Sequence, residues 1–159
     1  MYYILVALLA YIMGTSSMSL YISKWKKVEI RDKGSKNLGA SNAMLVFGWK
    51  YGILVALHDI GKAALAVILA RHFFPGLEHI GIVAGVASVL GHIFPFYLGF
   101  KGGKGIAATA GMVVALHWQF LPVAAVVFPN ESNASVLFLM SGCNPAISAI
   151  PPALSATGP

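Results

Sequence analysis

Apolar residues occupy four long stretches of the chain, and short polar segments separate them. The stretches are Tyr2–Ser23, Tyr51–Ala70, Ile80–Phe100 and Gly105–Phe128, and the first, third and fourth contain no Lys, Arg, Asp or Glu. A helix needs about 20 mostly apolar residues to cross a hydrocarbon layer about 30 Å thick. A soluble helix would instead show charged residues opposite its apolar stripe. The pattern therefore predicts an all-α fold, a polytopic transmembrane helical bundle of about four spans.

Composition supports a membrane protein and excludes an ordinary soluble domain. The 159 residues include 11 Lys and Arg and 5 Asp and Glu, and 58% of them are hydrophobic. The net charge of +6 comes mainly from the loops between spans. We interpret this charge as a sign of membrane orientation and phosphate affinity, and we expect no nucleic-acid partner.

The last part of the chain differs in character from the rest. Five of the eight prolines and a single charged residue, Glu131, lie in residues 129–159. Proline interrupts helices, and the run Val136–Met140 is too short to cross a bilayer. We therefore expect a membrane domain over residues 1–128, followed by a proline-rich, disordered tail over residues 129–159.

The basic residues predict the orientation of the bundle. Seven of the eleven lie between Lys24 and Lys50, and two more, Lys101 and Lys104, lie in the loop before the fourth stretch. Odd-numbered loops of a helical bundle face the same compartment, and loops rich in Lys and Arg face the cytoplasm. We therefore expect two cytoplasmic loops, both rich in glycine, and an external N-terminus.

The second of these loops has a composition suited to binding an anion. Lys104 lies among Gly102, Gly103 and Gly105 at the start of the fourth stretch. Glycines allow backbone N–H groups to converge, and a helix N-terminus and a lysine add positive charge. The loop is not a nucleotide P-loop, because Leu98 stands where that motif has its first glycine. The alternative is a tight turn between helices, with lysines that merely reach the membrane surface.

The first loop also favours anions. Its hydroxyl and amide groups are Ser35, Asn37, Ser41 and Asn42, and its charged groups include Arg31, Lys33 and Lys36. A short interfacial helix is expected over Ala43–Phe47, with Ser41 or Asn42 as its N-cap. A solvated basic loop against anionic headgroups is the alternative. Because both loops face one compartment, we expect a shared pocket that holds phosphorylated groups, with an apolar chain entering from the lipid.

Ionisable residues inside the second span form a further candidate group. Asp59 and Lys62 are three positions apart and share a helical face, and His58 lies one turn from Lys62. Charge in lipid is costly, so these residues should face the bundle interior and pair. They mark either a functional site or a conduction path, or they form a structural pair that fixes the rotation of the helix. His92 and Pro95 are expected to shape the end of the third span, and the spacing of the histidines predicts no metal site.

Both loops resemble the motifs of a known family, the bacterial membrane glycerol-3-phosphate acyltransferases that use acyl phosphate as donor. The family's first motif, G-S-G-N-x-G-A-T-N-x-x-R, is similar to the run Gly34–Leu45. Its second motif joins G-H-x-F-P to F-K-G-G-K-G-x-A, which resemble Gly91–Pro95 and Phe100–Ala107. The resemblance extends roughly from residue 2 to residue 120.

This resemblance implies transfer of an acyl group from acyl phosphate to the 1-hydroxyl of glycerol 3-phosphate, which gives lysophosphatidic acid. The site would face the cytoplasm at the bacterial inner membrane, with membrane lipids around it and without cofactor or metal. Ser35 and Lys104 would be catalytic residues that hold phosphate oxygens, and no side-chain nucleophile is implied. The residues implied in substrate binding are Gly34, Asn37, Gly39, Asn42, His92, Gly102, Gly103 and Gly105.

The chain departs from the family pattern at three points. Leu45 stands where the family has arginine, Lys36 replaces a glycine, and no histidine follows His117 to match the family's third motif, H-x-x-N-x-x-R-L. We therefore expect the chain as given to lack acyltransferase activity. The alternative function is a small transporter or channel subunit with Asp59 and Lys62 on its path, although carriers usually show inverted repeats, which are not visible here.

Overall fold

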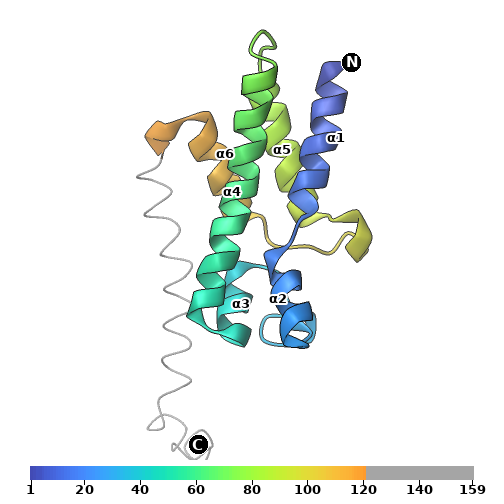
Figure 1. The fold of residues 1–159 in the computed structure, drawn as a ribbon, viewed down its shortest axis with the longest axis vertical. Coiled ribbons are helices and arrows are strands. Elements are labelled where there is room, and N and C mark those ends of the chain that lie inside the picture. The colour runs from blue at the N-terminus through green and yellow to red at the C-terminus, as the bar shows by residue number, and fades with distance from the viewer. Residues whose placement is uncertain (121–159) are drawn as a thin grey trace, which may run out of the picture.

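The structure is a computed structural model that describes residues 1–120. Four helices, α1, α4, α5 and α6, run alongside one another, and α2 and α3 lie together at one end of this bundle (Figure 1). The helices are α1 (Tyr2–Thr15), α2 (Met18–Lys26), α3 (Ala40–Phe47), α4 (Trp49–Phe73), α5 (Ile80–Ile93) and α6 (Ile106–Leu116). Three 3-10 turns, η1 (Ile30–Asp32), η2 (Phe96–Leu98) and η3 (Trp118–Phe120), complete the described elements. The fold is all-α, as predicted.

Within residues 1–120, three segments are long and apolar enough to span a membrane. They are Tyr2–Lys26, Trp49–Phe73 and Ile80–Leu98, which match the first three predicted stretches. The fourth predicted stretch begins with α6, which has 11 residues. Residues 121–128 of that stretch and the expected tail over 129–159 lie outside the described residues. The count of about four spans and the domain boundary at residue 128 therefore stay predictions.

Hydropathy predicts a continuous helix for the first span, but the structure has two helices there. The helix breaks at Ser16 and Ser17, between α1 and α2. Hydroxyl side chains compete with the backbone for hydrogen bonds, and the Thr15 hydroxyl donates to the Ile12 carbonyl at 2.7 Å. The break frees two carbonyls that other elements then satisfy. Tyr97 Oη donates to the Thr15 carbonyl at 2.6 Å, and Lys62 Nζ donates to the Ser16 carbonyl at 2.6 Å.

Close approaches at glycine hold the helices together. A Cβ at Gly14 of α1 would fall on the Ser88 carbonyl of α5, and a Cβ at Gly91 of α5 would fall on the Tyr11 carbonyl of α1. Gly111 of α6 likewise lies directly against the backbone of α4. Small residues at helix crossings let backbones approach, which is the usual packing of membrane helices.

The interfacial helix α3 is longer than predicted and begins differently. It starts at Ala40 with Gly39 as the N-cap, so the predicted caps Ser41 and Asn42 are wrong. Both residues lie inside the helix, where their side chains cannot cap it. The helix ends at Gly48, whose positive φ of 98° lets the chain turn directly into α4.

The two glycine-containing loops lie toward the same end of the bundle, and the N-terminus and the α4–α5 hairpin lie toward the other (Figure 1). At the hairpin end, Arg71 donates to the carbonyls of Ala115 and Leu116, both at 3.2 Å. These are C-terminal carbonyls of α6, where a cation is favourable. The arrangement agrees with loops that share one compartment, and the compartment itself stays a prediction.

Cysteine labelling tests the orientation. In a Cys143→Ser background, single cysteines at the exposed positions Lys36 and Lys101 should resist a membrane-impermeant thiol reagent in intact cells, whereas Gly76→Cys should react, since basic loops remain inside. All three should react after the cells are permeabilised. Labelling at Lys36→Cys in intact cells would reverse the orientation.

Candidate functional site

A pocket lies between the two loops, and α4 and α5 form its base. Its volume is about 130 Å³, several times the roughly 30 Å³ that one water molecule occupies in the liquid. The polar residues that line it are Ser35, Asn37, Ser41, Asn42, Asp59, His92 and Lys104. The apolar part of its wall includes Met44, Ile53 and Ala56. The predicted shared pocket is therefore present in the structure.

Asn42 organises the first loop. This side chain is 1% exposed, and its amide donates to the carbonyls of Ile30 at 3.1 Å and Asn37 at 2.7 Å. Its oxygen accepts the backbone N–H of Ser35 at 2.8 Å. Gly34 has a φ of 57°, and a Cβ there would fall on the Asn42 oxygen. The buried amide thus fixes the loop conformation that places Ser35 at the pocket.

Asn37 adds a local turn to the same loop. Its side-chain oxygen accepts the backbone N–H of Gly39 at 3.0 Å, which brings the chain into the start of α3. These hydrogen bonds order the loop, and the contact with substrate that the family resemblance implies for Asn37 and Asn42 stays a prediction.

The second loop is built differently from the convergent N–H cradle that the sequence suggests. The N–H of Gly102 donates to the Ile93 carbonyl at 2.9 Å, and the N–H of Gly103 donates to the His92 carbonyl at 3.1 Å. A Cβ at either glycine would overlap His92. Both glycines therefore let the loop fold closely onto the end of α5, and their predicted contact with substrate stays a prediction.

The N-terminus of α6 presents the positive end of a helix to the pocket. Gly105 is the N-cap, with a φ of 84°, and Gly105, Ile106 and Ala107 line the pocket beside Lys104. The first N–H groups of a helix have no partner within the helix, and its N-terminus attracts anions. Lys104 and this first turn together favour a phosphate group.

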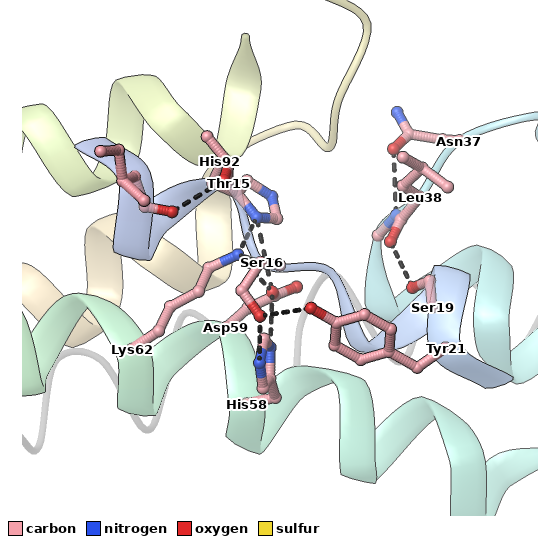
Figure 2. A network of polar contacts seen from close by, with 12 residues as sticks. Thr15, Ser16, Ser19, Tyr21, Asn37, Leu38, His58, Asp59, Lys62 and His92 are labelled. Atoms are coloured by element: carbon pink, nitrogen blue, oxygen red, sulfur yellow. Dashed lines mark hydrogen bonds and ion pairs between the residues drawn. The ribbon is translucent and has the colours of Figure 1, made fainter. Parts of the chain in front are cut away.

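A buried charged network lies beneath the loops. Asp59 is 2% exposed and Lys62 is 7% exposed, and Lys62 Nζ lies 3.0 Å from Asp59 Oδ1. His92 of α5 joins them, with its Nδ1 2.9 Å from Lys62 Nζ and 3.4 Å from Asp59 Oδ1 (Figure 2). The prediction that Asp59 and Lys62 face the interior and pair is confirmed. Asp59 and His92 also line the pocket, so the network is part of the site.

His58 extends this network toward the helix break. Its Nδ1 lies 3.5 Å from Asp59 Oδ1, and its Nε2 lies 3.2 Å from Ser16 Oγ, which in turn contacts Tyr21 Oη at 3.1 Å (Figure 2). The helix break therefore brings α1, α2 and α4 together around one polar cluster.

Charges elsewhere in the first loop lie away from the pocket. Arg31 pairs with Glu29 at 3.2 Å on the exposed surface. The hydrogen bonds that Arg31 donates lower the pKa of the Glu29 carboxyl, so it is ionised at neutral pH and offsets the Arg31 charge. Lys33 and Lys36 are exposed and do not line the pocket. Of the lysines in the two loops, only Lys104 does so within the described residues.

The structure thus brings together most of the predicted site residues. Those that line the pocket are Ser35, Asn37, Gly39, Asn42, His92, Lys104 and Gly105. Gly34, Gly102 and Gly103 lie behind it as close-packing positions. Sequence reasoning did not find the contribution of Ser16, whose carbonyl binds Lys62. The signal that was available is the run Thr15-Ser16-Ser17 inside an apolar stretch, since such residues often interrupt helices.

This fold and site define a helical integral membrane protein with a pocket lined by both loops at one end of its bundle. The family model for glycerol-3-phosphate acyltransferase matches residues 4–132. The chain belongs to this family.

Individual relatives agree with this assignment. Glycerol-3-phosphate acyltransferase 1 of Oceanobacillus iheyensis is 40% identical over 126 residues, covering 75% of this chain and 61% of that protein. A glycerol-3-phosphate acyltransferase of Listeria monocytogenes is 37% identical over 149 residues, covering 92% of this chain and 75% of that protein. The chain thus spans between 61% and 75% of the length of these two relatives.

A solved structure shows the same fold. The glycerol 3-phosphate form of PlsY (YgiH), an integral membrane glycerol 3-phosphate acyltransferase, superposes with a TM-score of 0.70 at 30% identity. The match covers 93% of this chain and 81% of that one. A lysophosphatidic acid form of the same protein matches with a TM-score of 0.69.

Proposed function

We propose that the pocket between the two loops belongs to an acyltransferase site that moves an acyl group from acyl phosphate to glycerol 3-phosphate. The product is lysophosphatidic acid, and the site faces the cytoplasm at the bacterial inner membrane. Family membership supports this function over the transporter alternative. The names of two solved neighbours add support, because PlsY is described in glycerol 3-phosphate and lysophosphatidic acid forms.

The observation that carries the proposal is the composition of the pocket. Lys104 and the start of α6 supply positive charge, Ser35 supplies a hydroxyl, and all three line one cavity. Such a site suits phosphoryl oxygens, since charged and N–H donors bind them most strongly. The apolar wall of Met44, Ile53 and Ala56 suits the start of an acyl chain.

The reaction asks mainly for positioning. The 1-hydroxyl oxygen of glycerol 3-phosphate attacks the acyl carbon, and the bond between that carbon and the phosphate oxygen breaks. The leaving phosphate takes the hydroxyl proton, so the products are the acyl ester and hydrogen phosphate. Ser35 and Lys104 stabilise the phosphoryl charge, and holding both substrates in place lowers the barrier. No covalent enzyme intermediate is needed.

Substituting Lys104 tests the proposal. In a version of the chain extended with a C-terminal segment that carries the family's third motif, Lys104→Ala should lower the kcat/KM for lysophosphatidic acid formation more than tenfold, which is about 1.4 kcal/mol of transition-state stabilisation. The measurement is transfer to radiolabelled glycerol 3-phosphate by purified protein supplied with acyl phosphate, together with release of inorganic phosphate. Binding of glycerol 3-phosphate without acyl phosphate provides a second readout that needs no turnover.

Lys101→Ala is the matched control, because Lys101 lies in the same loop, is exposed and does not line the pocket. It should retain wild-type binding and turnover. Equal losses in both variants would show that the loop contributes only general positive charge, and an unchanged Lys104→Ala would remove the phosphate-binding role.

A further inference from the structure

Lys62 has a complete set of hydrogen-bond acceptors. An ammonium group has three N–H donors and no acceptor. The structure places three acceptors around Lys62 Nζ: the Ser16 carbonyl at 2.6 Å, His92 Nδ1 at 2.9 Å and Asp59 Oδ1 at 3.0 Å. They come from the α1–α2 break, α5 and α4. Each donor therefore has one partner, and the partners include one histidine nitrogen.

This arrangement determines which nitrogen of His92 carries the proton. A nitrogen that accepts from an ammonium group must present a lone pair, so His92 Nδ1 is unprotonated. The competing possibility is an Nδ1–H that donates to Asp59 Oδ1, but that separation is 3.4 Å against 2.9 Å to Lys62. Such a proton would also point toward the ammonium group. The neutral imidazole then carries its proton on Nε2.

The Nε2 edge of the ring lies at the second loop. His92 lines the pocket together with Lys104, and a Cβ at Gly103 would fall on Nε2. Gly103 therefore lies directly against this nitrogen, one residue before Lys104, and a side chain at position 103 would block it. Within residues 1–120, the structure gives Nε2 no hydrogen-bond partner, whereas Nδ1 is bound by Lys62.

We propose that Asp59 and Lys62 hold His92 as the Nε2–H tautomer, and that this N–H donates to a phosphoryl oxygen bound beside Lys104. The identification of the anion rests on the proposed function, whereas the tautomer does not. His92 is then a substrate-contacting residue, and Asp59 and Lys62 are positioning residues that act through it. The phosphoryl group belongs to either acyl phosphate or glycerol 3-phosphate, and the two substrates are separated by the test below.

Two substitutions of His92 distinguish a donor from a structural residue. The Asn amide reaches the position of Nδ1, so His92→Asn keeps an acceptor for Lys62 but removes the donor at the pocket. The Gln amide reaches the position of Nε2, so His92→Gln keeps the donor. We expect His92→Asn to weaken binding of inorganic phosphate or glycerol 3-phosphate about tenfold, which is typical of the loss of one hydrogen bond to a charged group. His92→Gln should weaken binding no more than about threefold.

Kinetic measurements on the chain extended with the family's third motif identify the substrate. A rise in the KM for glycerol 3-phosphate alone in His92→Asn assigns the contact to the acceptor, and a rise in the KM for acyl phosphate alone assigns it to the donor. A fall in kcat with both KM values unchanged would overturn a ground-state contact with either phosphoryl group.

The tautomer is measured independently of activity. In protein labelled with ¹⁵N-histidine, the signals that disappear in His92→Gln belong to His92. They should show a protonated Nε2 and an unprotonated Nδ1 in the wild type. A protonated Nδ1 overturns the proposal, and so does wild-type phosphate binding by His92→Asn. If no lysophosphatidic acid is formed but the tautomer and phosphate binding are as expected, the inference stands and the proposed reaction fails.

Discussion

Lys62→Met is expected to destabilise the protein by about 3–5 kcal/mol, the usual cost of removing one partner from a buried ion pair. The Lys62 ammonium satisfies Asp59, His92 and the Ser16 carbonyl, and methionine cannot donate to any of them. The Asp59 carboxylate is 2% exposed, so the variant would leave a charge without its cation in a site with little room for hydration. Thermal unfolding of the detergent-solubilised protein should show a clear fall in Tm.

Two control variants test whether the unpaired Asp59 carboxylate causes the loss of stability in Lys62→Met. The double variant Asp59→Asn with Lys62→Met removes both charges, and it should recover most of the stability, since neutral replacement of a buried pair is often well tolerated. Lys33→Met removes an exposed lysine and should change stability by no more than about 0.5 kcal/mol. A double variant as unstable as Lys62→Met would show that the carbonyl and histidine contacts, and not the unpaired carboxylate, dominate.

Hydropathy and the cost of charge in lipid predict much of this fold. The first three spans follow from the length of the apolar stretches, because about 20 apolar residues in a row are what a membrane helix needs to cross the bilayer with its own backbone satisfied. The same cost predicts that Asp59 and Lys62 face inward and pair. Glycine and polar residues in two loops on one side predict a shared pocket for anions. The structure contains a pocket lined by both loops, and its affinity for anions stays a prediction.

The parts that sequence reasoning missed depend on contacts between residues far apart in the chain. Lys62 binds the carbonyl of Ser16, which is 46 positions earlier, and His92, which is 30 positions later. Local periodicity carries no information about such partners. Hydropathy also predicts one helix over Tyr2–Ser23, because serine and threonine lower the mean hydropathy of the stretch too little to indicate the break.

The loops show a second limit of prediction from sequence, since the same residue type can have several structural roles. Asn42 was predicted as a possible helix cap, but it is buried and binds the backbone of Ile30, Ser35 and Asn37. Gly102 was predicted to present its N–H to an anion, and that N–H instead binds the Ile93 carbonyl. In both cases, the choice depends on tertiary packing that the residue type alone does not specify.

The crossing of α1 and α5 sets the position of His92, so a small enlargement there should have a large effect. Gly14 and Gly91 each lie against a carbonyl of the opposite helix, where a Cβ would meet Ser88 and Tyr11. The obstacle is backbone and cannot rotate away. We expect Gly14→Ala and Gly91→Ala each to cost about 1–3 kcal/mol, toward the upper end of that range, as overpacking does. Gly91→Ala should also weaken phosphate binding, because it displaces the adjacent His92.

Gly61→Ala is the matched control for this crossing. Gly61 lies within α4, and a Cβ there meets nothing within 4 Å in the described part of the chain. Alanine is a better helix former than glycine, so this variant should gain about 0.5–1 kcal/mol. The same gain is available at Gly14, and the difference between the two Tm shifts therefore isolates the packing cost. Equal, stabilising shifts in Gly14→Ala and Gly61→Ala would show that α1 and α5 do not cross at glycine, and the position of His92 would then need another explanation.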